Sequence, residues 1–109
     1  MKDMNGLMRQ AQAMQQKLQE AKARLDETDF EGQAGSSLVK VVLNGAGVLK
    51  AVSIDESLVE PGEGETVGDL VVAAHADAKR KIDDAGQAMM RETMGPLAGL
   101  AGGMPGLKF

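Results

Sequence analysis

The sequence contains no cysteine, tryptophan or tyrosine, and phenylalanine occurs only twice among its 109 residues. The absence of cysteine excludes disulfide bonds and thiolate metal sites and fits a reducing compartment. Because aromatic side chains are so few, the core must be built largely from alanine, methionine and valine, and a single copy would be only marginally stable. We therefore expect an oligomer in which a second copy completes the core.

Long hydrophobic runs are also absent from the sequence. The amino-terminal residues lead directly into a polar amphipathic repeat, and no run of about 18 apolar residues could span a bilayer. We therefore expect a soluble, cytoplasmic protein that does not associate with membranes.

Charge is distributed unevenly along the chain, whose net value is −4. That total argues mildly against non-specific nucleic-acid binding by the molecule as a whole. Residues 1–25 nevertheless hold five basic and two acidic side chains, whereas residues 55–69 hold six acids and no base. The sequence therefore predicts a basic first helix and an acidic loop that repels DNA from its own side of the molecule.

The stretch from Ser36 to Asp55 predicts a β-hairpin around which the rest of the chain is organised. Apolar side chains alternate with the two-residue period of a strand, and many are β-branched. The two predicted faces consist of Val39, Val41 and Leu43, and of Val48, Val52 and Ile54. Residues 44–47, Asn-Gly-Ala-Gly, supply a turn of two or four residues, because asparagine and glycine tolerate positive φ. Residues 28–34 alternate more weakly and predict a first strand at the sheet edge.

Helices are predicted on both sides of this sheet. Residues 3–26 form a long helix with a heptad seam. The seam consists of Met4, Leu7, Ala11, Met14, Leu18, Ala21 and Leu25. In the simpler interpretation it packs on the chain's own second helix, and packing between chains can occur at the same time. That second helix covers about residues 67–93 after a loop over residues 56–65, with Thr66 and Asp69 as a capping box.

These elements predict an α+β fold, with a small antiparallel sheet between a long N-terminal helix and a long C-terminal helix. One domain covers residues 1–94. Residues 95–109 are rich in glycine and proline and predict a flexible tail that could attach Leu107 or Phe109 to a surface.

Catalytic groups are scarce. His75 is the only histidine, and its place beside the apolar rows of the second helix predicts a packed or half-buried structural role. No serine lies in a nucleophile motif, and Gly45 and Gly47 lack the other residues of a phosphate loop. The acids of the loop do not follow the calcium-loop pattern. We therefore predict no enzyme activity, no cofactor and no metal site.

A basic cluster, Lys-Arg-Lys at residues 79–81, occupies one turn of the second helix, close to three aspartates. The simplest interpretation is a solvated face with i,i+4 pairs such as Lys79 with Asp83. In a dimer, two such clusters and two basic first helices could hold phosphates that one chain would hold too weakly. No aromatic residues lie between these basic side chains. They therefore suit contact with the backbone of duplex DNA better than stacking on the nucleobases of single strands.

Several motifs occur together in a specific order. The first helix contains Leu-Met-Arg-Gln-Ala-Gln, which begins at Leu7. The first strand of the hairpin contains Leu-Val-Lys-Val-Val-Leu-Asn-Gly, and its second strand leads into Val-Ser-Ile-Asp-Glu-Ser-Leu-Val. Asp-Leu-Val-Val-Ala-Ala-His-Ala-Asp-Ala-Lys-Arg-Lys-Ile and the ending Met-Pro-Gly-Leu-Lys-Phe complete the set. In this order the sequence resembles the YbaB/EbfC nucleoid-associated proteins of bacteria over nearly its whole length.

The resemblance implies a homodimer whose sheets join and whose helical arms project like tweezers. It implies binding to double-stranded DNA with little sequence specificity, a role in nucleoid organisation or gene expression, and no catalysis. The implied phosphate-contacting residues are Arg9, Lys17, Lys22, Arg24, Lys79, Arg80, Lys81 and Arg91. His75 stands where some members are expected to have a larger aromatic residue, which implies looser packing there.

An alternative is a protein-interaction module. Its heptad helix and methionine-rich surface would recruit nucleoid, replication or recombination proteins, because methionine adapts to varied partners. DNA association would then be indirect. An enzyme is the third and weakest hypothesis.

Overall fold

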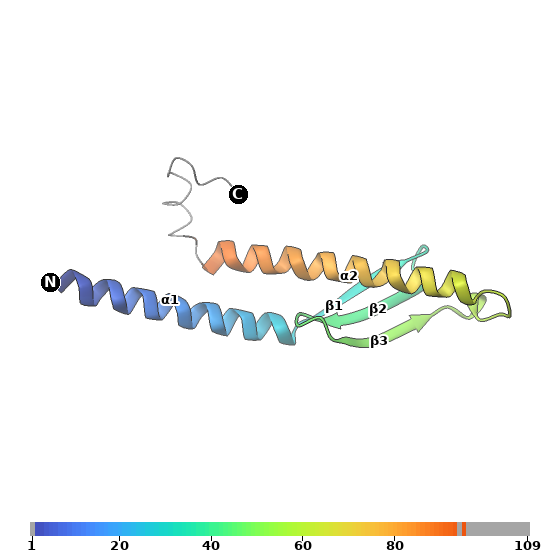
Figure 1. Ribbon diagram of the computed structural model, residues 1–109, viewed down its shortest axis with the longest axis horizontal. Helices are drawn as coiled ribbons and strands as arrows, with labels where there is room; N and C mark the ends of the chain where they lie inside the picture. The colour runs from blue at the N-terminus through green and yellow to red at the C-terminus, as the bar shows by residue number, and fades with distance from the viewer. Residues whose placement is uncertain (1, 94, 96–109) are drawn as a thin grey trace, which may run out of the picture.

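A computed structural model describes residues 2–93 and 95 of the chain. The molecule is elongated and has an α+β fold. The helix α1 extends beyond one end of a three-stranded sheet, and α2 runs across the sheet and then beside α1 (Figure 1). In chain order the elements are α1 (Lys2–Glu27), β1 (Asp29–Ala34), β2 (Val39–Asn44), β3 (Leu49–Ile54), the 3₁₀ turn η1 (Glu56–Leu58) and α2 (Gly64–Thr93). The predicted fold class, including the first strand, is therefore confirmed.

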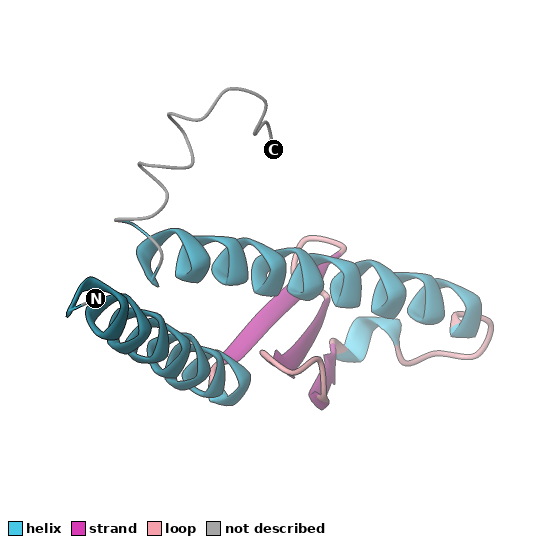
Figure 2. Ribbon diagram, turned by 60° about the vertical axis from the view of Figure 1, so that its left-hand side comes forward, coloured by secondary structure: helices cyan, strands magenta, loops and turns pink. Residues whose placement is uncertain are grey.

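The sheet is antiparallel throughout, in the order β1-β2-β3. The central strand β2 buries Val39, Val41 and Leu43 completely, as its alternation predicts. These side chains point toward α2, which covers β1 and β2 and leaves β3 largely uncovered (Figure 2). The sheet therefore has one packed face, one solvated face and one open edge.

The turn between β2 and β3 has four residues. The Asn44 side-chain oxygen accepts hydrogen bonds from the backbone N–H groups of Ala46 and Val48, each at 3.0 Å. A register irregularity between Val42 and Leu43 then places Leu49, rather than Lys50, opposite Leu43, so that Leu49 and not Val48 shares the face of Val52. The predicted face on the second run is therefore wrong at Val48, which precedes the strand, because sequence alternation does not reveal a bulge.

The packing of α2 on the sheet depends on small residues. Ala74 and Ala78 are fully buried, and β1 passes beneath them at Gly32. A Cβ atom at Gly32 would lie only 2.0 Å from the Ala74 carbonyl oxygen and 2.6 Å from the Ala78 nitrogen. Glycine is therefore required at this position by close approach of the two backbones.

The first helix is held to the sheet at its carboxyl end. The Gly45 N–H donates to the Thr28 carbonyl oxygen at 2.9 Å. A Cβ atom at Gly45 would lie 1.8 Å from the carbonyl oxygen of Leu25, so the hairpin turn lies directly against the end of α1. From there α1 runs beside the second half of α2, and we refer to these two segments as the arm (Figure 1).

The heptad seam of α1 meets α2 along only part of its length. Ala21 is buried and Met14, Leu18 and Leu25 are partly buried, whereas Leu7 is 63% exposed. The predicted packing on the chain's own second helix is therefore confirmed for the half of α1 nearest the sheet.

Two details of the second helix differ from the prediction. It begins at Gly64, and the Val67 N–H already donates to the Glu63 carbonyl oxygen at 2.9 Å. Thr66 therefore lies inside the first turn and is not a cap. His75 is exposed, because the helix faces the sheet with Ala74 and Ala78 and turns the intervening side chain to solvent. Of the predicted tail over residues 95–109, all but Gly95 lie outside the described residues.

We expect Gly32→Ala to lower the free energy of unfolding by about 1–3 kcal/mol, because the added methyl group overlaps backbone atoms of α2. Gly68→Ala is the matched control. Gly68 lies in α2, and a Cβ atom there would meet no other part of the described chain within 4 Å. Alanine at this position should raise the free energy of unfolding by about 0.5–1 kcal/mol. Urea denaturation followed by far-UV circular dichroism measures both changes. Equal effects of the two substitutions would contradict the proposed packing constraint.

Candidate nucleic-acid interface

Three basic side chains form a stripe along α1. Arg9, Lys17 and Arg24 lie within about 80° of one another around the helix axis, since each residue advances the helix by about 100°. All three are exposed. The helical rise separates neighbouring members by about 12 and about 10 Å along the axis. We call these three residues the basic stripe.

Lys22 lies on a different side of the same helix. It is at least about 140° from each member of the basic stripe around the axis. Its ammonium group pairs with the Asp26 carboxylate at 3.4 Å. The members of the basic stripe make no ion pair with any residue that the structure describes.

A groove of about 990 Å³ runs between α1 and the end of α2, and we call it the arm groove. Its apolar wall includes Leu7, Ala11 and Met14 of α1. Lys17 and Arg24 also line it, so the basic stripe borders this groove. Arg91 is exposed on the last turn of α2, at the same end of the molecule.

The basic cluster at residues 79–81 lies over the sheet rather than on the arm. The Lys81 ammonium group donates to the Glu31 carbonyl oxygen at 2.7 Å and pairs with the Asp77 carboxylate at 3.6 Å. Arg80 pairs with the same carboxylate. The predicted pair of Lys79 with Asp83 is wrong, and the i,i+4 ion pair of this segment joins Asp77 to Lys81 instead. Lys79 is exposed.

Asp77 links α2 to the first strand. Its carboxylate accepts a hydrogen bond from the Gln33 backbone N–H at 3.0 Å. This bond is the main reason that the pKa of Asp77 lies below its ordinary value of 3.8, and the charges of Lys81 and Arg80 lower the pKa further. From the sequence, Asp77 is expected only to neutralise the nearby basic cluster. Its hydrogen bond to the first strand is not apparent there, because Gln33 lies 44 residues away.

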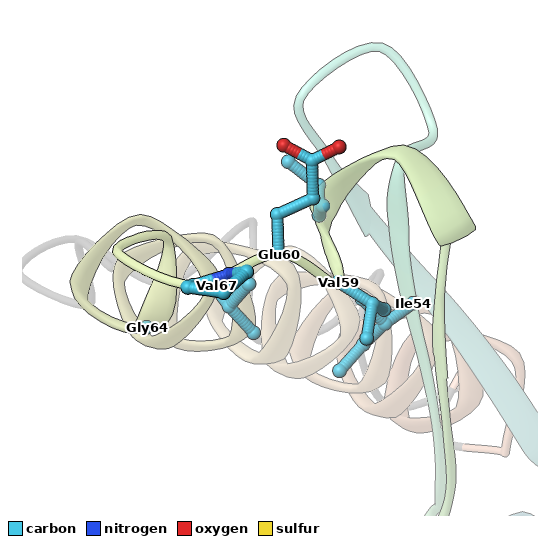
Figure 3. Close-up of a pocket in the computed structure, with 7 residues that line it drawn as sticks. Ile54, Val59, Glu60, Gly64 and Val67 are labelled. Atoms are coloured by element: carbon cyan, nitrogen blue, oxygen red, sulfur yellow. The ribbon is translucent and has the colours of Figure 1, made fainter.

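The open edge of the sheet carries apolar side chains. Val52 and Ile54 lie opposite Val41 and Val39 and therefore on the α2 side, yet they are 43% and 37% exposed. A shallow pocket of about 430 Å³ continues this surface, with Ile54 and Val59 among its lining residues (Figure 3). In Figure 3 the Glu60 carboxylate points away from these two side chains. Composition predicts a thin core but does not locate this surface.

The basic stripe and the acidic loop lie at opposite ends of the long axis. The arm with the basic stripe lies at one end, and η1 with the acidic loop lies at the other (Figure 1). Across residues 2–93 no three acidic, histidine or cysteine side chains gather closely enough to hold a metal ion. In the same region no helix is both long and apolar enough to cross a membrane.

Known proteins resemble this chain in sequence and in fold. The model of the family described as the YbaB/EbfC DNA-binding family matches residues 1–97. A nucleoid-associated protein of Caulobacter sp. (strain K31) is 59% identical over the full length of both chains. One from Thermobifida fusca is 44% identical over 96% of this chain and 91% of that protein. The crystal structure of an uncharacterized Helicobacter pylori protein shares the fold, with a TM-score of 0.60 at 21% identity over 73% of this chain and 93% of that chain.

We expect Asp77→Asn to lower the melting temperature at pH 7 and to have less effect as the pH falls. A carboxyl group with a lowered native pKa stabilises the folded chain above its ordinary value of 3.8, and this contribution is lost as the pH falls through the native pKa. Thermal unfolding between pH 7 and pH 3 measures the difference between the two chains. Asp83→Asn, which removes an exposed carboxylate from the same helix, is the control and should change little. A difference independent of pH would contradict this role for Asp77.

Proposed function

Because this chain belongs to the YbaB/EbfC DNA-binding family, we propose that it binds double-stranded DNA as a homodimer with little sequence specificity. In this way it organises the nucleoid or affects gene expression, and it works in the cytoplasm at the nucleoid. Its relatives are named nucleoid-associated proteins, which supports this assignment. The observation that carries the proposal is the exposed basic stripe on an otherwise acidic chain.

The basic stripe contacts the DNA backbone. Lysine and arginine bind phosphates irrespective of base sequence, and no aromatic side chain accompanies them to stack on bases. The basic side chains are spaced by about 10–12 Å along α1, which is comparable with the width of the major groove of DNA, about 12 Å. Successive basic side chains can therefore reach phosphates on either side of that groove. Weak sequence preference follows from this mode of contact.

The acidic loop directs the DNA to the arm. Six acids without a base lie between residues 55 and 69, at the end of the molecule away from the arm. They repel a polyanion approaching that end, while the basic stripe attracts it at the other.

Lys79 and Arg91 supply further phosphate contacts. Lys22, Arg80 and Lys81 contribute less, because each pairs with an aspartate of its own helix.

The dimer forms through the open edge of the sheet. An edge strand offers unpaired backbone groups to a second strand, and β3 also presents exposed Leu49, Val52 and Ile54. Two copies related by a two-fold axis would bury these side chains in one continuous sheet. The dimer then carries two arms, and simultaneous contact by both strengthens binding beyond that of either arm.

We expect Lys17→Ala to weaken binding to every DNA sequence tested. In a dimer it removes two phosphate contacts, so the slope of log affinity against log salt should become shallower by about 1.8. Fluorescence anisotropy of a generic duplex, titrated at several salt concentrations, measures the slope. Lys22→Ala is the matched control, since it removes the same charge from another side of α1 and should preserve most of the slope.

Equal losses in the two variants would contradict the assignment to the basic stripe. Absence of binding by the unaltered chain even at low salt would overturn direct DNA binding. Co-purification of such a chain with one stoichiometric protein would favour the protein-interaction module instead, for which the apolar wall of the arm groove provides a surface.

We expect Val52→Asp to convert the dimer to a monomer, because the substitution places a charge within the apolar surface of β3. Sedimentation velocity measures the mass, and circular dichroism checks the fold. Ala51→Asp is the control, since Ala51 is exposed on the opposite face of the same strand and its dimer should persist. A Val52→Asp chain that remains dimeric would rule out this interface.

A further inference from the structure

The arm groove leaves part of the first helix uncovered. Met4 and Met8 are 62% and 59% exposed, and Leu7 is similarly exposed in the groove wall. The helices of the arm are in contact nearer the sheet, where Ala21 is buried. Toward the other end of α1, the heptad seam continues without a packing partner among residues 2–93 and 95. The arm groove, of about 990 Å³, is larger than the pocket of about 430 Å³ beside Ile54 and Val59.

A segment with suitable chemistry follows the groove directly. Glu92 and Thr93, at the end of α2, form part of the groove wall, and residues 96–109 come immediately after them. Half of these 14 residues are apolar, and Lys108 is their only charged side chain. Such a composition differs from that of segments that stay solvated through high charge and low hydrophobicity. The larger apolar members are Leu97, Leu100, Met104, Leu107 and Phe109.

The length of this segment matches the groove. The lining residues of α1 extend from Leu7 to Arg24, which corresponds to about 26 Å of helix. Fourteen extended residues reach up to about 46 Å, and their starting point lies at the groove itself. Phe109 can therefore reach most of the wall, even if the segment is only half extended.

We propose that residues 96–109 bind in the arm groove of their own chain, with their apolar side chains against Leu7, Ala11 and Met14. The segment supplies the packing partner that the uncovered half of the heptad seam lacks.

A tryptophan reporter tests the proposal without DNA. The chain has no tryptophan, so Phe109→Trp introduces a single fluorophore into the full chain. We expect its emission to be shifted to the blue and protected from acrylamide quenching, compared with N-acetyltryptophanamide, because the indole ring leaves water. Both properties should be independent of protein concentration, as contact within one chain requires.

A pair of matched substitutions locates the contact. Ala13→Arg places a long side chain in the groove wall, and the tryptophan should then show the emission and quenching of the free fluorophore. Ala23→Arg adds the same side chain to an exposed position about 140° away from the centre of the groove wall and should preserve the protected signal. Circular dichroism checks that both variants are folded.

Free tryptophan behaviour in the unaltered groove would overturn the proposal. So would protection that survives Ala13→Arg, since the ring would then lie on another surface. Protection that appears only as concentration rises would assign the contact to a second copy and would also contradict binding within one chain. None of these results depends on whether the protein binds DNA.

Discussion

The close contact between Gly32 and the second helix determines where the rest of the structure lies. Because β1 has no side chain at this point, the backbones of β1 and α2 approach at Ala74 and Ala78. The first half of α2 therefore lies on β1 and β2, and its second half extends beyond the sheet. Beyond the sheet, α2 packs beside α1. The carboxyl end of α1 is itself held against the sheet by its contact with Gly45. The arm is thus a consequence of two backbone contacts at glycine.

The same placement of α2 separates charged side chains that stabilise the fold from basic side chains that are free to bind a ligand. Over the sheet, Asp77 binds the Gln33 N–H and pairs with two bases of the neighbouring cluster. Lys81 also donates to the Glu31 carbonyl oxygen and so helps Asp77 to hold α2 to β1. On the arm, by contrast, the basic stripe pairs with no residue among those described, and the acids of the loop lie at the opposite end of the molecule. An acidic protein can therefore present a basic surface over a limited region.

Incomplete coverage is the third consequence of this placement. A sheet of three strands at about 5 Å per strand is about 15 Å wide, and a single helix of about 10 Å diameter cannot cover it. The third strand, β3, therefore retains exposed apolar side chains. The arm groove is a second uncovered surface, because the two helices bury only part of the heptad seam. The two proposals above give these two surfaces different partners, a second copy at β3 and the chain's own residues 96–109 at the groove.

Periodicity and composition were sufficient to predict the two long helices, the three strands and the buried face of β2. These features depend on local repeats of two or 3.6 residues, which need no knowledge of distant contacts. The exposure of His75, the engagement of Lys81 by Glu31 and Asp77, and the open edge at β3 became apparent only in the folded chain. The physical reason is that these properties depend on where α2 crosses the sheet. That position is set by the contact of Gly32 with Ala74, residues 42 positions apart in the sequence.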